Sequence, residues 1–164
     1  MNSHTARADF FDASALVKVY SDEPGSSVVR AYFHTRPTKY TTPFCFYEAM
    51  NVLKGKWKHK GLLTLDQYLE AAFRLTAWYG ASSSRIKDLD FTDPLTFMDA
   101  KAVAERNKLD LSDAFQILSV KKGYFSVLVN ESATVLVTGD KELAEAAKLE
   151  GLRPWNLMLE PAPE

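Results

Sequence analysis

The fold is decided by the stretch Val135-Leu136-Val137-Thr138-Gly139-Asp140, in which an apolar run ends in a carboxylate. Near the beginning of the chain, Phe10-Phe11-Asp12 repeats this arrangement. Short apolar runs that stop at glycine or a polar residue are typical of buried strands. Each aspartate is therefore expected at the carboxyl end of a buried strand.

The rest of the chain alternates short segments of strand character with longer segments of helical periodicity. Further strands are expected around 39–42 and 152–155, with another short one through Ile86, Leu89 and Phe91. Helices are expected over 14–20, 25–33, 42–60, 64–79, from 93 past Ala104, from Asp110 or Ser112 onward, and over 141–149.

Strands separated by helices imply parallel crossovers. The predicted fold class is therefore α/β, with a central parallel sheet of four to five strands flanked by helices. The functional crevice of such a sheet lies at the carboxyl ends of its strands, where Asp12 and Asp140 are expected.

Length and composition fit one compact domain. The chain has 164 residues, 46% of them hydrophobic and 25% charged, so residues 1–156 are expected to form a single domain, followed by a tail over 157–164 that frays from Leu159. No segment resembles a signal peptide or approaches the roughly 20 apolar residues of a membrane span, which predicts a soluble, cytoplasmic protein. The lone Cys45 excludes disulfides and cysteine-rich zinc sites. The net charge of −1 gives no general attraction for polyanions.

Two further acids, Glu48 and Asp113, interrupt apolar helical patterns. Each of the four acids also has a structural explanation. Asp12 and Asp140 are suited to cap the helices that follow them. Asp113 is favoured by the dipole in the first turn of its helix, and Glu48 is suited to a salt bridge with a neighbouring helix. Together these readings require four separate explanations, so one shared site is the stronger hypothesis.

Such a site has defined chemistry. Carboxylates roughly 5 Å apart repel by about 3 kcal/mol per pair at an effective dielectric near 20, so four of them protonate in part or recruit cations. Hard oxygen ligands without histidine or thiolate select Mg²⁺ or Mn²⁺ over zinc. A metal of this kind suits hydrolysis of a phosphodiester. Ser14 and Thr138 are candidates to orient the carboxylates or a metal-bound water; a cap and a strand-end residue are the alternatives.

At these residues the chain resembles the PIN-domain ribonucleases, most closely the VapC toxins of type II toxin–antitoxin systems. The matching segments are Phe11-Asp12-Ala13-Ser14-Ala15-Leu16-Val17-Lys18 with Glu23-Pro24-Gly25, Glu48-Ala49 with Asn51-Val52-Leu53, Leu111-Ser112-Asp113-Ala114, and Leu136-Val137-Thr138-Gly139-Asp140-Lys141-Glu142-Leu143. They occur in the order of the family over about residues 8–156. Val127 to Ser132 departs from the pattern as a small insertion, and Asp110 competes with Asp113.

The resemblance implies a PIN-like three-layer sandwich, with residues 1–156 as a single PIN domain. It implies that Asp12, Glu48, Asp113 and Asp140 hold Mg²⁺ or Mn²⁺ and act in catalysis. Endonucleolytic cleavage of RNA, a homodimer and inhibition by a small antitoxin are also implied.

A dense basic run lies just beyond Glu48. Phosphate contacts and base stacking are candidate roles for Lys18, Lys54, Lys56, Trp57, Lys58 and Lys60. A solvated helix end, with cations placed against the helix dipole, is the alternative for the run. His59 is expected at the surface.

Two rival functions remain. A HAD-like phosphatase would use Asp12 as a covalent nucleophile, but Ser14 stands where that family has a second aspartate. A PIN-like fold kept only to bind protein or RNA is the non-enzymatic alternative.

Overall fold

A four-stranded parallel sheet forms the centre of the computed structural model, which describes residues 7–127 and 134–164. Its strands are β1 (Asp9–Phe11), β2 (Lys39–Tyr40), β3 (Val135–Thr138) and β4 (Arg153–Asn156), in the spatial order β2-β1-β3-β4. β1 and β3 pair with Phe10 opposite Leu136 and Phe11 opposite Val137. The predicted α/β class with a parallel sheet is confirmed, and the two strands that precede Asp12 and Asp140 are direct neighbours.

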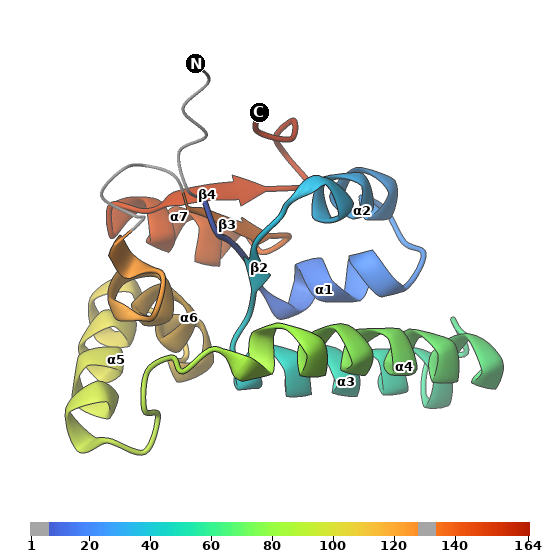
Figure 1. The fold of residues 1–164 in the computed structure, drawn as a ribbon, viewed down its shortest axis with the longest axis horizontal. Coiled ribbons are helices and arrows are strands. Elements are labelled where there is room, and N and C mark those ends of the chain that lie inside the picture. The colour runs from blue at the N-terminus through green and yellow to red at the C-terminus, as the bar shows by residue number, and fades with distance from the viewer. Residues whose placement is uncertain (1–6, 128–133) are drawn as a thin grey trace.

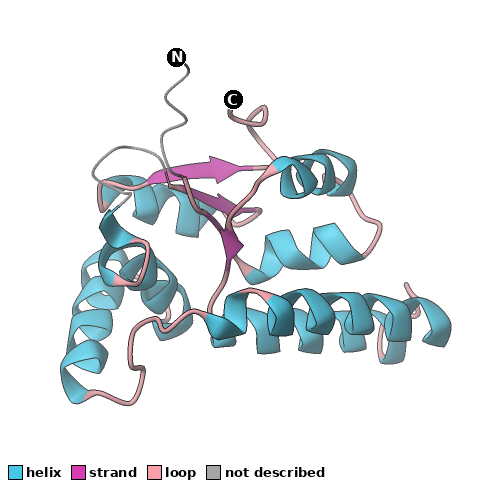
Figure 2. Ribbon diagram, in the orientation of Figure 1, coloured by secondary structure: helices cyan, strands magenta, loops and turns pink. Residues whose placement is uncertain are grey.

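Seven α-helices within the described residues flank the sheet (Figures 1 and 2). They are α1 (Ala13–Tyr20), α2 (Ser26–Thr35), α3 (Pro43–Lys58), α4 (Leu65–Ala81), α5 (Pro94–Asn107), α6 (Leu111–Lys122) and α7 (Lys141–Leu149). Figure 1 shows α3 and α4 as a long antiparallel pair next to α1, with α5 and α6 as a second pair at the other end of the molecule. None of these helices is long and apolar enough to cross a bilayer.

The core surrounds the central strand pair. Phe10, Phe11 and Leu136 are completely buried, and successive side chains of a strand point to opposite faces of the sheet. Apolar side chains therefore pack on both faces of the sheet. This explains why the sequences of β1 and β3 are uninterrupted apolar runs. Cys45 is a free, buried thiol in this core.

The strand expected through Ile86, Leu89 and Phe91 does not form. A short 3₁₀ helix, η1 (Ser83–Arg85), is followed by a loop in which Leu89 and Phe91 pack against a cluster under α5 and α6. The Ser83 hydroxyl accepts from the Thr41 N–H at 2.9 Å and donates to the Thr41 carbonyl at 2.8 Å. Ser83 thus satisfies the backbone N–H and carbonyl of Thr41, just beyond β2. The apolar residues Ile86, Leu89 and Phe91 are explained by packing against the core rather than by strand pairing.

Several contacts hold the segment after β4 against the rest of the molecule, although Leu159 is exposed. Leu157 is buried, the Trp155 indole N–H donates to the Glu160 carbonyl at 3.1 Å, and Arg7 donates to the Glu164 carbonyl at 2.8 Å. The insertion expected over 127–132 falls almost entirely on residues 128–133, which lie outside the described residues.

Candidate metal centre

Asp12 lies at the point where β1 ends and α1 begins. Its Oδ1 accepts the Ala15 N–H at 2.7 Å and so caps α1, while its own N–H donates to the Val137 carbonyl at 3.1 Å. Only 3% of the residue is exposed. The cap expected as an alternative is therefore real, and it fixes the carboxylate at the carboxyl end of the sheet.

Two hydroxyl groups hold the same carboxylate. Ser14 Oγ lies 2.7 Å from Oδ1 and 2.9 Å from Oδ2 of Asp12, and Thr138 Oγ1 donates to Oδ2. Thr138 Oγ1 also accepts the Asp140 N–H at 2.9 Å, and Ser14 Oγ accepts the Gly139 N–H at 2.8 Å. The hydroxyls therefore join the end of β1 to the turn after β3. Both hydroxyls contact the Asp12 carboxylate, although in the sequence Thr138 lies close to Asp140.

The other acids come from three helices. Asp140 caps α7 by accepting the Leu143 N–H at 3.1 Å, and Asp110 caps α6 by accepting the Asp113 N–H at 2.9 Å. Asp113 stands in the first turn of α6, half-buried, and Glu48 is exposed on α3. Asp110 and Asp113 were the two candidates for the third acid of the site. Asp110 is the exposed N-cap of α6, and Asp113 is the more buried of the two.

The electrostatics show that these acids share one environment. Burial, assisted by the charge of Asp140, raises the pKa of Asp12 to about 6 against the opposing hydrogen bonds of Thr138, Ala15 and Ser14. Burial also raises the pKa of Glu48, with Asp110 and Asp140 adding to the effect. The pKa of Asp113 rises to about 7 through burial and then through the charges of Asp110, Asp140, Asp12 and Glu48. The charges of the other three predicted acids and of Asp110 therefore all act on Asp113.

Repulsion of this kind is what a divalent cation relieves. Among residues 7–127 and 134–164, no group of three or more acidic, histidine or cysteine side chains is arranged to hold a metal ion as the side chains stand. The donor set nevertheless fits a hard cation, because it consists of carboxylate oxygens. Glu48 and Asp140 are exposed.

The basic run divides into two groups. Lys54, Lys58 and Lys60 are exposed, as is His59. Lys56 is 8% exposed, bonded to Glu23 and to Ser21 Oγ at 3.1 Å. Lys56 was a candidate for phosphate contact, but its side chain is buried and its ammonium group is already paired with Glu23.

Two other candidates for RNA contact are also engaged within the protein. Lys18 bonds to Glu23, and Trp57 stacks on Tyr68 with ring centroids 5.1 Å apart. Burial alone would raise the pKa of Glu23, but its hydrogen bonds with Lys18 and Lys56 outweigh burial and lower that pKa. Glu23 belongs to the Glu23-Pro24-Gly25 segment, but no pattern in the sequence indicates its ion pairs with Lys18 and Lys56.

Gln116 is a second residue that the sequence did not single out. It is 2% exposed, and its Nε2 donates to Asp113 Oδ1 at 3.0 Å. A polar residue three positions after Asp113, on the same side of an otherwise apolar helix, was the signal available in the sequence.

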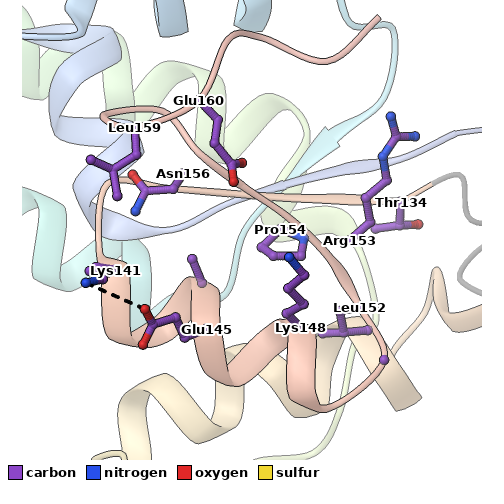
Figure 3. Close-up of a pocket in the computed structure, with 12 residues that line it drawn as sticks. Thr134, Lys141, Glu145, Lys148, Leu152, Arg153, Pro154, Asn156, Leu159 and Glu160 are labelled. Carbon is purple, nitrogen blue, oxygen red and sulfur yellow. Dashed lines mark ion pairs between the residues drawn. The ribbon is translucent and has the colours of Figure 1, made fainter.

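A cleft of about 510 Å³ lies elsewhere, between α7, β4 and the chain after β4 (Figure 3). Its lining mixes both signs of charge, as in Lys148 and Glu160, with apolar Leu152 and Pro154. Lys141 and Glu145 pair along its rim at 3.7 Å. None of the four predicted acids lines this cleft, so it is separate from the metal centre.

Comparison with known proteins agrees with this architecture. The chain is similar to the crystal structure of PAE2754 from Pyrobaculum aerophilum, with a TM-score of 0.55 and 24% sequence identity over 90% of this chain and 89% of that one, a likeness that shows the fold. No curated protein matches the sequence. A family model of the PIN domain, whose members are usually metal-dependent nucleases, matches residues 10–149. With most of its length matched by that model, the chain belongs to the PIN-domain family.

Proposed function

We propose that the protein is an endoribonuclease that depends on Mg²⁺ or Mn²⁺ and serves as the toxin of a type II toxin–antitoxin pair. The observation that carries the proposal is the mutual repulsion of Asp12, Glu48, Asp113 and Asp140 at the carboxyl end of β1 and β3. Family membership supports nuclease chemistry in general. RNA as the substrate, and the role as a toxin, rest on the resemblance of the sequence segments to VapC proteins.

The four acids would hold the ion, which supplies Lewis acidity toward a phosphodiester and lowers the pKa of a water molecule. The chain itself contributes position and charge. Asp12 is locked by its cap to Ala15 and by the hydroxyls of Ser14 and Thr138. Glu48 and Asp140 are both exposed, so solvent reaches their carboxylates.

The test compares the wild type with Asp12→Asn and Asp113→Asn on labelled RNA, with Mg²⁺, with Mn²⁺ and with a chelator. Cleavage by either variant should fall by more than about 100-fold. Mutating a residue that only hydrogen-bonds a metal ligand already lowers metal affinity or activity by about 10- to 100-fold. Both variants should melt at or above the wild-type temperature without metal, because each removes a buried charge that its neighbours repel. Their expression should no longer inhibit growth.

Asp66→Asn is the matched control, because Asp66 is an exposed aspartate in the first turn of α4. It should cleave RNA like the wild type. Retained cleavage in both Asp12→Asn and Asp113→Asn would disprove the mechanism. Equal, metal-independent RNA binding by the wild type and Asp12→Asn without any cleavage would instead favour the non-enzymatic alternative. Membership of the PIN family leaves the HAD-like phosphatase without support.

Two partners follow from the VapC resemblance and are proposed with it. The protein would form a homodimer, for which light scattering should give about twice the 18.4 kDa of the chain. A small antitoxin would suppress the growth inhibition when it is expressed together with the protein. A monomer in solution would contradict the first proposal, and a toxicity that no neighbouring reading frame relieves would contradict the second.

A further inference from the structure

Gln116 occupies a position in α6 where a polar side chain is unfavourable. It is 2% exposed, and the residues on either side of it, Phe115 and Ile117, belong to the buried apolar clusters. Its Oε1 finds no hydrogen-bond partner among the described residues. A leucine or methionine of similar size would fill this space without leaving a buried oxygen unpaired.

The nitrogen of the Gln116 side-chain amide has a partner, unlike the oxygen. Gln116 Nε2 donates to Asp113 Oδ1 at 3.0 Å. The reverse orientation would set the amide oxygen against a carboxylate, so the contact with Asp113 fixes the orientation and leaves Oε1 as the unpaired atom. The buried Oε1 of Gln116 therefore remains without a hydrogen bond as long as Nε2 donates to Asp113.

Asp113 is the acid that most needs such a contact. Burial and the charges of the other acids raise its pKa to about 7. A neutral N–H donor stabilises the ionised carboxylate without adding a charge that would compete with a cation. It also fixes the rotation of the carboxylate, since one of the two oxygens is engaged.

We propose that Gln116 is a positioning residue of the candidate metal centre: its Nε2 holds Oδ1 of Asp113, and Oδ2 is the oxygen that would bind the ion. The inference rests on the proposed metal-dependent nuclease. It assigns a role at the metal centre to a residue that lies in the core and contacts neither ion nor RNA. In this assignment, α6 carries both a candidate ligand and its support, spaced three residues apart.

The test uses Gln116→Leu and Gln116→Met, which keep the volume and remove the donor. Ser119→Ala is the matched control, because Ser119 lies one turn further along α6, fully buried, with an Oγ that also has no partner in the part of the chain that the structure describes. Mn²⁺ affinity is measured by calorimetry on the whole protein, and the melting temperature is measured without metal.

All three variants should melt at or above the wild-type temperature, because each removes an unpaired buried oxygen. Mn²⁺ binding should weaken about 10-fold in the two Gln116 variants and stay unchanged in Ser119→Ala. The Mn²⁺ concentration for half-maximal RNA cleavage should rise by the same factor, while cleavage at saturating Mn²⁺ stays close to that of the wild type.

Wild-type Mn²⁺ affinity in either Gln116 variant would overturn the inference, as would equal weakening in Ser119→Ala. Loss of folding in both Gln116 variants would show a purely structural role and would also overturn it. Asp12→Asn separates this failure from failure of the metal centre itself. If Asp12→Asn loses Mn²⁺ and Gln116→Leu does not, only the role of Gln116 fails; if the wild type binds no Mn²⁺, both proposals fail.

Discussion

At the scale of single residues, the cap that Asp12 forms is compatible with the metal site that the sequence offered as the other interpretation. Its Oδ1 caps α1, and its Oδ2 accepts the hydroxyl of Thr138. Asp140 likewise caps α7 and adds its charge to those around Asp12 and Asp113. A helix start places backbone N–H groups and a positive dipole end beside a carboxylate, which is also a suitable place for a candidate metal ligand. The cap is therefore no argument against the candidate metal site.

Thr138 offers a direct test at this scale. Thr138→Val keeps the shape of the side chain but removes the hydroxyl that bonds both the Asp12 carboxylate and the Asp140 N–H. We expect a loss of about 1–3 kcal/mol in the free energy of unfolding, because a buried carboxylate loses a donor, together with reduced RNA cleavage. Urea denaturation and a cleavage assay measure the two effects.

Thr138→Ser is the control for that experiment, since it retains the hydroxyl. It should cleave RNA nearly as well as the wild type. If Thr138→Val and Thr138→Ser prove equally active, the hydroxyl does not support the site.

At the scale of elements, the strands that carry the site could be predicted because each is an apolar run that ends in an acid. The 86–91 segment could not be predicted correctly from the same kind of signal. Its apolar residues pack under α5 and α6, while Ser83 satisfies the backbone beyond β2. Local periodicity reports which side chains are buried, but it does not report what covers them. The same limit applies to Gln116, whose partner is visible only in three dimensions.

The lysines of α3 give a prediction at this scale, because neighbouring charges on one helix have different surroundings. Lys56→Met breaks the bond that ties α3 to Glu23 and should lower the free energy of unfolding by about 1–3 kcal/mol. Lys54→Met alters an exposed residue and should change stability by less than about 0.5 kcal/mol. Denaturation and RNA-binding titrations at several salt concentrations measure both variants.

If α3 contacts RNA through its exposed lysines, Lys54→Met should weaken binding and reduce the salt dependence by about one unit of slope. Equal stability of the two variants would contradict the buried ion cluster. Unchanged RNA affinity in Lys54→Met would remove Lys54 from the proposed RNA contacts.

At the scale of the whole molecule, Glu150 joins three helices. Its carboxylate bonds to Arg106 and Asn107 at the end of α5 and to Lys121 of α6, directly after α7 ends. The hydrogen bond from Arg106 is the main reason that the pKa of Glu150 lies far below its usual range; those of Lys121 and Asn107 add to it against the effect of burial. A folded pKa below the unfolded value stabilises the protein above the unfolded pKa, and this stability is lost as the pH falls toward the folded pKa.

Glu150→Gln should therefore lower the free energy of unfolding by about 1–2 kcal/mol at pH 7. We expect no larger loss, because Arg106 is half-exposed and solvent screens its interaction with Glu150. The difference from the wild type should shrink as the pH falls from about 5 toward 2. Urea denaturation across this range measures it. Glu105→Gln, on an exposed pair with Lys101, should show little effect at any pH. A difference for Glu150→Gln that stays constant with pH would contradict the assignment.

The pairing of β1 with β3 also determines when the site appears during synthesis. The bond between Thr138 and Asp12 joins residues 126 positions apart, which at about 5–20 residues per second separates their synthesis by roughly 6 to 25 s. Throughout that interval β1 has no β3 to pair with. A nascent or prematurely terminated chain that ends before β3 therefore lacks the Asp12–Thr138 contact and Asp140, so the candidate metal centre cannot assemble in it.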